Sequence, residues 1–460
     1  MNKEGEVVKF KARLVAKGYS QILGMDYMDT FAPVVHLETI RSVMSTAASL
    51  DWEIQQMDVK EVYLNGILKE EVYMEQPEGY NDRTGRVCRL KKTLYGLKQS
   101  GHEWNIELNQ RLTSIGFRQL KSDPCMYIRN SADGSEIITV WVDDLLLFAK
   151  TSSLMNGLKK ELNTILDVTD LGEPKKIVGI EITRDRPNRS IQISQSKYIE
   201  SILAKQGLQT CNAVGMPLDP AIILKKEDSD PNSNRDNRYG SLIGSLMYLA
   251  VATQPDIAYS IQRLSSFTAN PGMKHWIAAK RVLRYLSGTH NLGIKYQGSS
   301  KPGIRFTGWT DADFASDPND RISISSYVFK LGNGAITWSS KKQNAVSLSS
   351  TEAEYTAMAH AAHEAIWLRN LFEELNFPQH KLTILFGDNQ SALAIARDPQ
   401  YHARSKHFDI KSHYIRNKIR EQVIKDIYCP TENMIADIFT KPLHKPKHWK
   451  FTTDLGMSSA

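Results

Sequence analysis

Two adjacent aspartates, Asp143 and Asp144, interrupt the longest strongly apolar stretch of the sequence, Ile137 to Ala149. They divide it into two short apolar runs, which predicts two β-strands joined by a tight turn. Turn chemistry explains one aspartate at such a position, but two neighbouring carboxylates beside an apolar sheet repel each other unless a cation offsets their charge. From the residues alone two interpretations stay open, a solvated turn and a site for a divalent metal such as Mg²⁺.

The composition is that of an ordinary globular protein. A length of 460 residues corresponds to roughly two to four domains. The net charge of +7 permits a nucleic-acid partner without establishing one. Four scattered cysteines without a C-x-x-C pair argue against a disulfide framework and a cysteine-based zinc finger. They predict an intracellular location, the cytoplasm first and the nucleus as the alternative. No apolar run reaches the length of a membrane span, so we expect no membrane partner.

The periodicity of apolar residues predicts two mixed units separated by a helical spacer. In the first unit, amphipathic helices are expected around 104–115 and 154–165. The polar segment 227–237 has the composition of a linker. The remaining predicted elements are helical structure over 239–286, strands over 305–311 and 325–338, a helix over 350–375, a strand over 381–387 and a helix-rich basic tail.

Four further carboxylates are spread over the last unit. Asp311 and Asp388 end predicted strands, Glu354 lies near the start of the long helix, and Asp437 lies in the segment 432–441. Each one alone is explained by helix capping or a turn. Carboxylates at the ends of separate strands can converge at one edge of a sheet, which favours a cluster. Glu352 is the alternative to Glu354.

The segment between Tyr401 and Arg420 has one-sided charge. It holds six Lys or Arg, three His and a single Asp. The spacing of its histidines argues against a zinc site. A solvated face is the general explanation of such a run, but beside an acidic cluster it favours contacts with phosphates. The residues expected to make these nucleic-acid contacts are Arg404, Lys406, Lys411, Arg416 and Lys418.

Ordered motifs add a resemblance to a known family. Residues 11–21 (KARLVAKGYSQ), 30–35, 58–66, 90–99 and the Val-Asp-Asp box occur in the order found in the reverse transcriptase of copia-type retrotransposons, which this chain resembles. The motifs that resemble the ribonuclease H domain of the same elements lie at 309–317, 338–343, 348–355, 388–392 and 436–442.

The resemblance covers nearly the whole chain and implies its architecture. We expect an α+β and α/β multidomain protein, with a right-hand polymerase (fingers and palm) over 1–216. A linker and helical connection follow over 217–302. A ribonuclease H-like mixed sheet with helices is expected over 303–443, and a tail over 444–460.

The resemblance also implies roles for particular residues. Asp58, Asp143 and Asp144 match the palm carboxylates that hold two Mg²⁺ ions, for which Mn²⁺ can substitute. Tyr63 matches the aromatic that excludes ribonucleotides, and Gln99 a glutamine near the incoming nucleotide. The finger residues that grip its triphosphate are matched by Lys11 and Arg13. In the second unit, the residues matching a second pair of metal sites are Asp311, Glu354, Asp388 and Asp437.

These matches imply an RNA-directed DNA polymerase with ribonuclease H activity. Its expected partners are an RNA template, a DNA primer, an RNA–DNA hybrid and deoxynucleoside triphosphates; particle association is a family property. The alternative is a catalytically decayed remnant that only binds nucleic acid.

Several positions depart from the family pattern. Gly101 and His102 stand where the family has Pro-Arg, Trp141 where it has Tyr, His36 where it has Arg, and Gln254 where it has Arg. The family's first finger strand, which precedes the motif at 11–21, is mostly missing. We therefore expect a 5′-shortened copy of the terminal enzyme portion with an impaired polymerase.

Overall fold

The computed structural model describes residues 12–229, 238–298, 303–397 and 409–459. By packing, the chain forms two compact units, of which the first comprises Met1–Val35 and Glu53–Pro174, and the second His36–Trp52 and Lys175–Ala460. The sequence-based boundaries at 216, 302 and 443 do not coincide with this division. Two segments that precede residue 216, one early helix and the strands after 175, pack with the C-terminal half.

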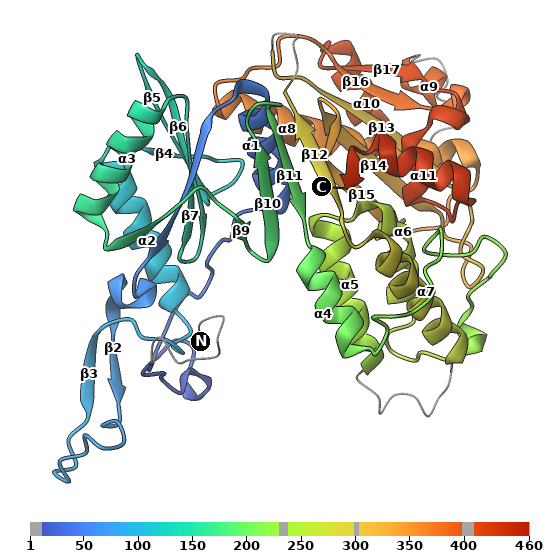
Figure 1. The fold of residues 1–460 in the computed structure, drawn as a ribbon. Helices are drawn as coiled ribbons and strands as arrows, with labels where there is room; N and C mark the ends of the chain where they lie inside the picture. The colour runs from blue at the N-terminus through green and yellow to red at the C-terminus, as the bar shows by residue number, and fades with distance from the viewer. Residues whose placement is uncertain (1–11, 230–237, 299–302, 398–408, 460) are drawn as a thin grey trace. The chain divides into compact units, whose positions relative to one another are not determined.

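Unit 1 contains a six-stranded antiparallel sheet in the order β4-β5-β6-β7-β1-β8. Helix α3 (Ser152–Ile165) packs on its central strands, and α2 (Ser100–Ser114) contacts β4 and β2 (Figure 1). These are the two helices that the apolar periodicity predicts. The strands are β1 (Glu53–Val59), β4 (Arg118–Gln119), β5 (Met126–Ser131), β6 (Gly134–Trp141), β7 (Asp144–Ala149) and β8 (Val168–Gly172).

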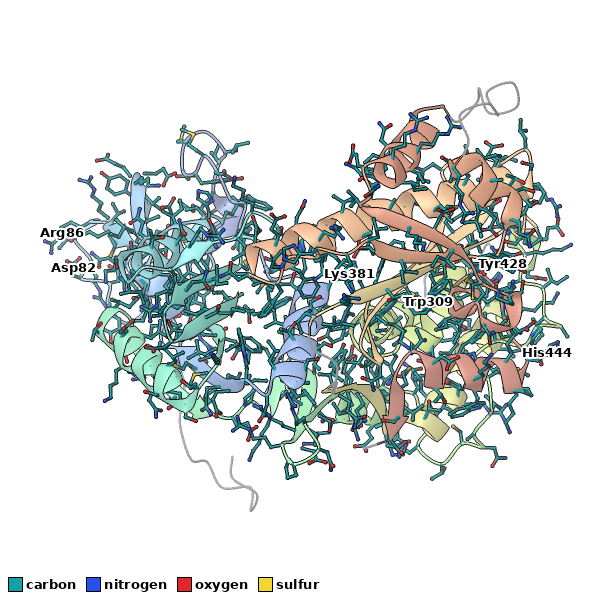
Figure 2. All side chains as sticks on the ribbon, turned by 90° about the horizontal axis from the view of Figure 1, so that it is seen from above. Asp82, Arg86, Trp309, Lys381, Tyr428 and His444 are labelled. Carbon is teal, nitrogen blue, oxygen red and sulfur yellow. The ribbon has the colours of Figure 1, made fainter. Side chains whose placement is uncertain are left out.

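A separate two-stranded hairpin projects from unit 1. Its strands are β2 (Ile67–Met74) and β3 (Cys88–Lys92) (Figure 1). In the loop between them Asp82 forms an ion pair with Arg86 (Figure 2). Because an isolated two-stranded hairpin is only marginally stable in water, its base must be held by the neighbouring helix α2, which β2 contacts.

The first sheet of unit 2 is mixed, in the order β15-β14-β13-β16-β17. The hairpins of β13, β14 and β15 are antiparallel, whereas β16 runs parallel to β13 and to β17. The long helix α8 packs on β13 and β14. The expected mixed sheet with helices is confirmed. Its elements are β13 (Phe306–Asp313), β14 (Ile324–Leu331), β15 (Gly334–Lys342), α8 (Ser350–Glu374), β16 (Thr383–Gly387), α9 (Gln390–Arg397), α10 (Asp409–Arg420) and β17 (Ile424–Tyr428).

A second sheet in unit 2 was not anticipated from the sequence. It has the order β18-β12-β11-β10-β9 and combines strands from three distant parts of the chain. The region expected to be a helical spacer thus also contributes a strand, and the expected tail supplies both helix α11 (Lys445–Asp454) and the edge strand β18. The strands are β9 (Lys176–Ile177), β10 (Ile180–Asp185), β11 (Ser190–Ser194), β12 (Leu292–Gln297) and β18 (Met457–Ser459).

The predicted helical region is present, and it lies in the sequence between β11 and β12, two strands of the same sheet. Helices α4 (Ser196–Lys205), α5 (Arg238–Ala252), α6 (Ala258–Ser265) and α7 (Met273–Thr289) share one apolar core. Among the helices of the described residues, none has both the length and the apolar character that crossing a membrane requires.

Helix α1 (Leu37–Leu50) joins unit 2 through a buried arginine. The side chain of Arg41 is 1% exposed and its guanidinium lies 4.0 Å from the ring centre of Trp338. Its Nε donates to the Ile336 carbonyl (2.6 Å), and its Nη1 donates to the carbonyls of Val251 (2.7 Å) and Ala252 (3.0 Å). A buried cation is tolerated only when its hydrogen bonds are satisfied. These carbonyls from β15 and the end of α5 therefore fix α1 in place.

Candidate active sites

The palm carboxylates lie on two neighbouring strands of the unit 1 sheet. Strand β1 pairs with β7 so that Asp58 stands directly opposite Asp144. Directly opposite residues of an antiparallel pair project from the same face of the sheet. The register thus brings together two of the three aspartates that the sequence singles out, and Asp143 adjoins them in the β6–β7 turn.

The turn that presents Asp143 has an unusual backbone. Its first residue, Val142, has φ 55°, a left-handed conformation that a β-branched side chain rarely adopts. The Val142 carbonyl accepts a hydrogen bond from Trp104 Nε1 (2.9 Å), and the Asp143 carbonyl accepts one from the Val59 amide (2.8 Å). These contacts hold the strained turn. It lies one residue earlier than predicted, so that Asp144 already begins β7.

Electrostatics distinguish Asp144 from its neighbours. Burial raises the pKa of its carboxyl, a hydrogen bond from Gln56 Nε2 to Oδ1 (2.9 Å) opposes that rise, and the charges of Asp143 and Asp58 add to it. Asp58 is half-buried and Asp143 is exposed. Three carboxylates that repel one another next to an apolar sheet are a donor set suited to a hard divalent cation.

Two of the four nucleotide-binding residues expected from the resemblance, Tyr63 and Arg13, lie around one aromatic ring. Tyr63 packs edge-to-face on Tyr95, with ring centres 5.0 Å apart, and the Arg13 guanidinium lies 5.2 Å from the Tyr95 ring centre. Burial raises the pKa of Tyr63, and the next contribution comes from Asp143. Tyr63 therefore lies in the electrostatic neighbourhood of the palm carboxylates. No role was predicted for Tyr95, although it lies in the motif at 90–99.

Gln99 differs from its expected role. Its side chain is fully buried, Oε1 accepts from Gln21 Nε2 (3.0 Å), and Nε2 donates to the Asp26 carbonyl (2.9 Å). The amide is thus used to fasten the segment containing Gln21 and Asp26 to the start of α2, and it offers no exposed group to a nucleotide in this structure. Lys11 lies outside the described residues.

The second acidic site is a compact cluster in unit 2. Asp311, Glu354 and Asp388 each place one carboxylate oxygen within 4.8 Å of the others. Asp311 lies on β13 and Asp388 directly follows β16; these strands are parallel neighbours, so their carboxyl ends share one edge of the sheet. Of the described residues, no other three acidic, histidine or cysteine side chains come this close, so the palm aspartates form a looser group.

Contacts at the start of α8 give the two candidate glutamates, Glu352 and Glu354, different roles. Ser349 caps the helix by accepting from the Glu352 amide (3.1 Å), and Glu352 Oε2 accepts from the Leu348 amide (2.8 Å). Glu352 therefore completes the helix cap. Glu354 lies two residues later, is 7% exposed, and belongs to the cluster.

The cluster is desolvated. Burial, followed by the charge of Asp437, raises the pKa of Asp311 to about 7, although Thr440 donates a hydrogen bond to its Oδ2. Burial and then the charges of Asp311 and Asp388 raise the pKa of Glu354 well above its ordinary value. Oxygen ligands whose charges repel one another in a buried site fit a hard divalent cation, which would offset that repulsion.

The fourth expected carboxylate, Asp437, lies beside the cluster and is paired with two lysines. It is fully buried; Lys441 Nζ lies 2.8 Å from its Oδ1, and Lys447 Nζ donates to its Oδ2 (2.5 Å). Burial would lower the pKa of Lys441, but the charges of Asp311 and Asp437 raise it. Neither lysine was predicted to pair with Asp437, although Lys441 stands four residues after it, a helical spacing.

The basic stretch is described only in part. Arg404 and Lys406 lie outside the described residues, as does the side chain of Lys411. Arg416 is 3% exposed and its Nε donates to the Ile395 carbonyl (3.2 Å), so it packs α10 against α9 and is not an open phosphate contact. Lys418 pairs with Glu421 (2.7 Å).

Comparisons with known proteins agree with the motifs. Residues 1–220 match the family model described as reverse transcriptase (RNA-dependent DNA polymerase). The chain is 39% identical to the retrovirus-related Pol polyprotein from transposon TNT 1-94 of Nicotiana tabacum, covering 100% of this chain and 35% of that protein. It is 36% identical to the Pol polyprotein from transposon RE1 of Arabidopsis thaliana, over 99% of this chain and 31% of that protein. A transposon Ty5-1 protein of Saccharomyces cerevisiae is 33% identical and is matched over 100% of its length by 67% of this chain.

The chain belongs to the reverse transcriptase family, as the reverse transcriptase and ribonuclease H portion of a copia-type retrotransposon Pol polyprotein. It spans about a third of the length of the two plant polyproteins.

Two solved structures also match. One is ribonuclease H1 of Halobacterium salinarum NRC-1, 20% identical over 30% of this chain and 94% of that one, with a TM-score of 0.20. The other is the foamy viral protease-reverse transcriptase in complex with double-stranded DNA, 11% identical over 82% of this chain and 68% of that one, with a TM-score of 0.20.

Proposed function

We propose that this chain carries two phosphoryl-transfer activities, RNA-directed DNA synthesis in unit 1 and hydrolysis of the RNA strand of RNA–DNA hybrids in unit 2. The observation that supports the proposal is that motif carboxylates from distant parts of the sequence gather into two separate acidic groups, one in each unit. Two separate groups suit two reactions that use the same type of cation.

In unit 1, Asp58, Asp143 and Asp144 would hold divalent cations, Mg²⁺ with Mn²⁺ as a substitute. When bound, such ions stabilise charge on the transferring phosphoryl group and lower the pKa of the primer 3′-hydroxyl. The chain's own contribution is orientation: Gln56 fixes the Asp144 carboxylate, and the Trp104 contact fixes the turn. The Tyr63 ring, braced by Tyr95, would exclude the 2′-hydroxyl of a ribonucleotide.

In unit 2, Asp311, Glu354 and Asp388 would hold the cation that activates water and polarises the scissile phosphate. Thr440 orients the Asp311 carboxylate, and the cap at Ser349 and Glu352 fixes the first turn of α8 from which Glu354 projects. Asp437 was expected to complete a second metal site. We propose that it acts at the border of the cluster, because both its oxygens are already neutralised by lysines.

The proposed partners follow from these reactions. They are an RNA template, a DNA primer, an RNA–DNA hybrid and deoxynucleoside triphosphates. One observation favours the alternative of a remnant that only binds nucleic acid. His102, which stands where the family has arginine, uses Nδ1 in a hydrogen bond with the Phe31 carbonyl (2.7 Å) and replaces a permanent cation with a weaker base.

The test is a primer-extension assay on a poly-ribonucleotide template with Mg²⁺ or Mn²⁺, beside a hybrid-cleavage assay on the same preparation. Asp58→Asn and Asp388→Asn serve as matched controls, one for each site. Loss of extension alone with the first and of cleavage alone with the second supports two sites. A chain that binds primer–template but shows neither activity supports the remnant.

A further inference from the structure

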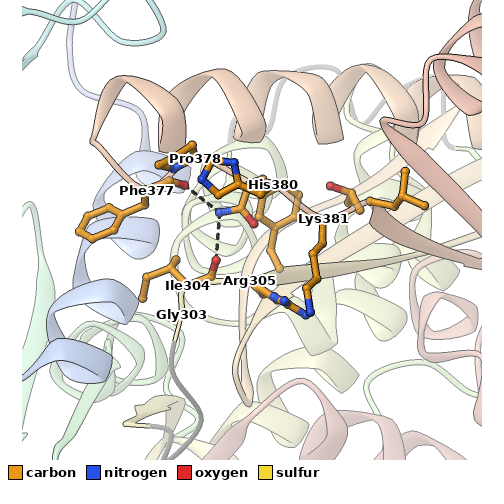
Figure 3. A pocket seen from close by; sticks show the side chains of 11 residues that line it. Gly303, Ile304, Arg305, Phe377, Pro378, His380 and Lys381 are labelled. Atoms are coloured by element: carbon orange, nitrogen blue, oxygen red, sulfur yellow. Dashed lines mark hydrogen bonds between the residues drawn. The ribbon is translucent and has the colours of Figure 1, made fainter.

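A cavity of about 390 Å³ lies at the amino ends of β13 and β16 in unit 2. One wall is formed by residues 303–306 and the other by residues 377–383, in the connection between α8 and β16 (Figure 3). Its volume is within the range of pockets that bind small molecules. None of the carboxylates of the proposed active sites lines it.

The cavity is at the opposite end of the sheet from the acidic cluster. Arg305 precedes β13 and Asp311 lies near its far end; Lys381 precedes β16 and Asp388 follows it. At ~3.3 Å per residue, the six or seven residues between them correspond to about 20 Å. Figure 2 shows Lys381 well separated from Tyr428, the last residue of the neighbouring strand β17. The cavity is thus a distinct site.

The walls are held by hydrogen bonds that need no ligand. Gln379 Nε2 donates to the Ile304 carbonyl (3.0 Å) across the cavity mouth and to the Phe377 carbonyl (2.9 Å) within its own wall (Figure 3). Behind that wall, Arg369 of α8 donates Nη1 to the Lys381 carbonyl (3.0 Å) and Nη2 to the Gln379 carbonyl (2.5 Å). A binding site held in shape this way loses little conformational entropy when a ligand enters.

The charge of the cavity is positive. The side chains of Arg305 and Lys381 point toward one another (Figure 3), and both are exposed. Within the described part of the chain, neither forms an ion pair with a carboxylate. Two cations that face one another without an anion repel, and a phosphate between them would remove that repulsion and accept bidentate hydrogen bonds from the guanidinium.

The rest of the lining is partly apolar and partly polar, since Gln379, His380 and Thr383 also line the cavity. Ile304, Phe377, Pro378 and Leu382 contribute side chains to the cavity. An inorganic ion alone would leave this surface unused, whereas the sugar or base of a nucleotide would cover it. The combination of two converging cations with an apolar wall defines the ligand by its chemistry: a phosphate attached to a compact, partly apolar group.

We propose that this cavity is a nucleotide-phosphate site, separate from both proposed active sites. The phosphate can come from a free nucleoside monophosphate or from a nucleic-acid strand, and both present the same group to Arg305 and Lys381. The site requires neither a divalent cation nor catalysis, so it stands or fails independently of the proposed function.

Binding to the full chain in EDTA tests the proposal, because without divalent ions the acidic sites do not contribute. The probes are thymidine 5′-monophosphate, thymidine, inorganic phosphate and a short oligodeoxynucleotide without terminal phosphates, measured by titration calorimetry or ligand-observed NMR. We expect the monophosphate to bind and thymidine not to bind. Binding of the oligonucleotide in competition with the monophosphate would identify a strand as the source, and its absence a free nucleotide.

The variants assign the binding to this cavity. Arg305→Gln with Lys381→Gln should weaken monophosphate binding at least roughly tenfold, because two charge-assisted contacts are lost. The charge-matched control Lys205→Gln with Lys280→Gln removes two exposed lysines on α4 and α7 and should change it less than about twofold. The exchange Arg305→Lys with Lys381→Arg should retain most of the binding. Equal affinity in the wild type and in the Arg305/Lys381 double variant, or no binding of any phosphate probe, would overturn the proposal.

Discussion

The two acidic sites of this protein use the same side-chain chemistry in different surroundings. In unit 1 the aspartates lie on the β6–β7 hairpin and on the neighbouring strand β1, with Asp143 exposed and Asp58 half-buried. In unit 2, Asp311 is 2% exposed and Glu354 is 7% exposed. Burial disfavours the charged form, so the cluster of unit 2 must exchange protons for a cation.

The difference also concerns what neutralises the surplus charge. The palm carboxylate Asp144 has a neutral partner in Gln56. In unit 2, Lys441 and Lys447 supply two fixed positive charges at Asp437. A buried site with built-in cations is more sensitive to a single charge change than an open one, because screening by water is weaker there. The following predictions test this contrast, beginning with the largest effect.

Asp388→Asn should abolish hybrid cleavage, by roughly a thousandfold or more, because an amide cannot supply the anionic ligand that a hard cation requires. DNA synthesis should be unchanged, which primer extension on the same preparation measures. Glu352→Gln is the control in the same unit; it alters only a helix cap, and cleavage should stay within about threefold of the wild type. Equal loss of both activities in Asp388→Asn would contradict two separate sites.

Tyr63→Ala should let ribonucleotides into the growing strand, since the ring that blocks the 2′-hydroxyl is removed. We expect the ratio of ribo- to deoxynucleotide incorporation to rise roughly 10- to 100-fold, the range in which shape alone rejects an added hydroxyl. Tyr63→Phe keeps the ring and should leave the ratio unchanged. An unaltered ratio in Tyr63→Ala would remove this residue from sugar selection.

Hybrid cleavage should fall more steeply than DNA synthesis when the pH is lowered from 8 to 6. The raised pKa of Asp311, about 7, means that its metal-free carboxyl is ionised at pH 8 and mostly protonated at pH 6. One proton then competes with the cation, which lowers cation affinity by about tenfold over this range. Titration of Mn²⁺ at each pH, with Asp388→Asn to remove the unit 2 site, measures the two affinities. Parallel pH profiles for both sites would contradict the role we give to burial.

Lys447→Met should strengthen Mn²⁺ binding in unit 2 several-fold, because it removes a positive charge beside the carboxylates and frees one oxygen of Asp437. Lys445→Met is the matched control, since Lys445 is exposed on the same helix. Weaker Mn²⁺ binding in Lys447→Met would mean that the lysine organises the cluster and does not compete with the cation.

The smallest effect is expected from Gly101→Pro combined with His102→Arg, which restores the family residues. Both lie in the first turn of α2, where proline is tolerated. A Cβ at position 101 would lie 3.0 Å from the Cβ of Ala32, so the gain is partly offset by crowding. We expect primer extension to rise a few-fold and hybrid cleavage to stay unchanged. A simultaneous rise in cleavage would indicate a general effect on folding.

The sequence predicted the elements that local patterns specify. The strands around Asp143, the two helices of unit 1 and the long helix α8 are present because each has its own apolar periodicity. The second sheet of unit 2 was missed because its strands are short and pair over long sequence distances, as β12 does with β18. Such pairing depends on tertiary packing and leaves no local signal.

The candidate sites, like the fold, could be predicted from the sequence only in part. Motif matching selected the three residues of the unit 2 cluster, and the parallel arrangement of β13 and β16 explains why they meet. It did not reveal that Gln99 is buried or that Lys447 pairs with Asp437, because both depend on which distant backbone and side-chain groups become neighbours. Resemblance transfers residue identities, whereas hydrogen-bond partners must be read from the fold.

The burial of Arg41 determines when helix α1 can complete its packing while the chain is being synthesised. Its acceptor, the carbonyl of Ile336, follows it by 295 residues. At the usual rate of translation that interval is roughly 15 to 60 s, during which α1 has left the ribosome without its final partners. The strand β1 that follows it belongs to unit 1 and can pair much earlier. Helix α1 therefore stays without these partners until the C-terminal half is synthesised, while the unit 1 sheet that follows it in the chain is already forming. A fragment that stops at residue 216 would lack β12, β14 and β15, three of the strands that α1 contacts.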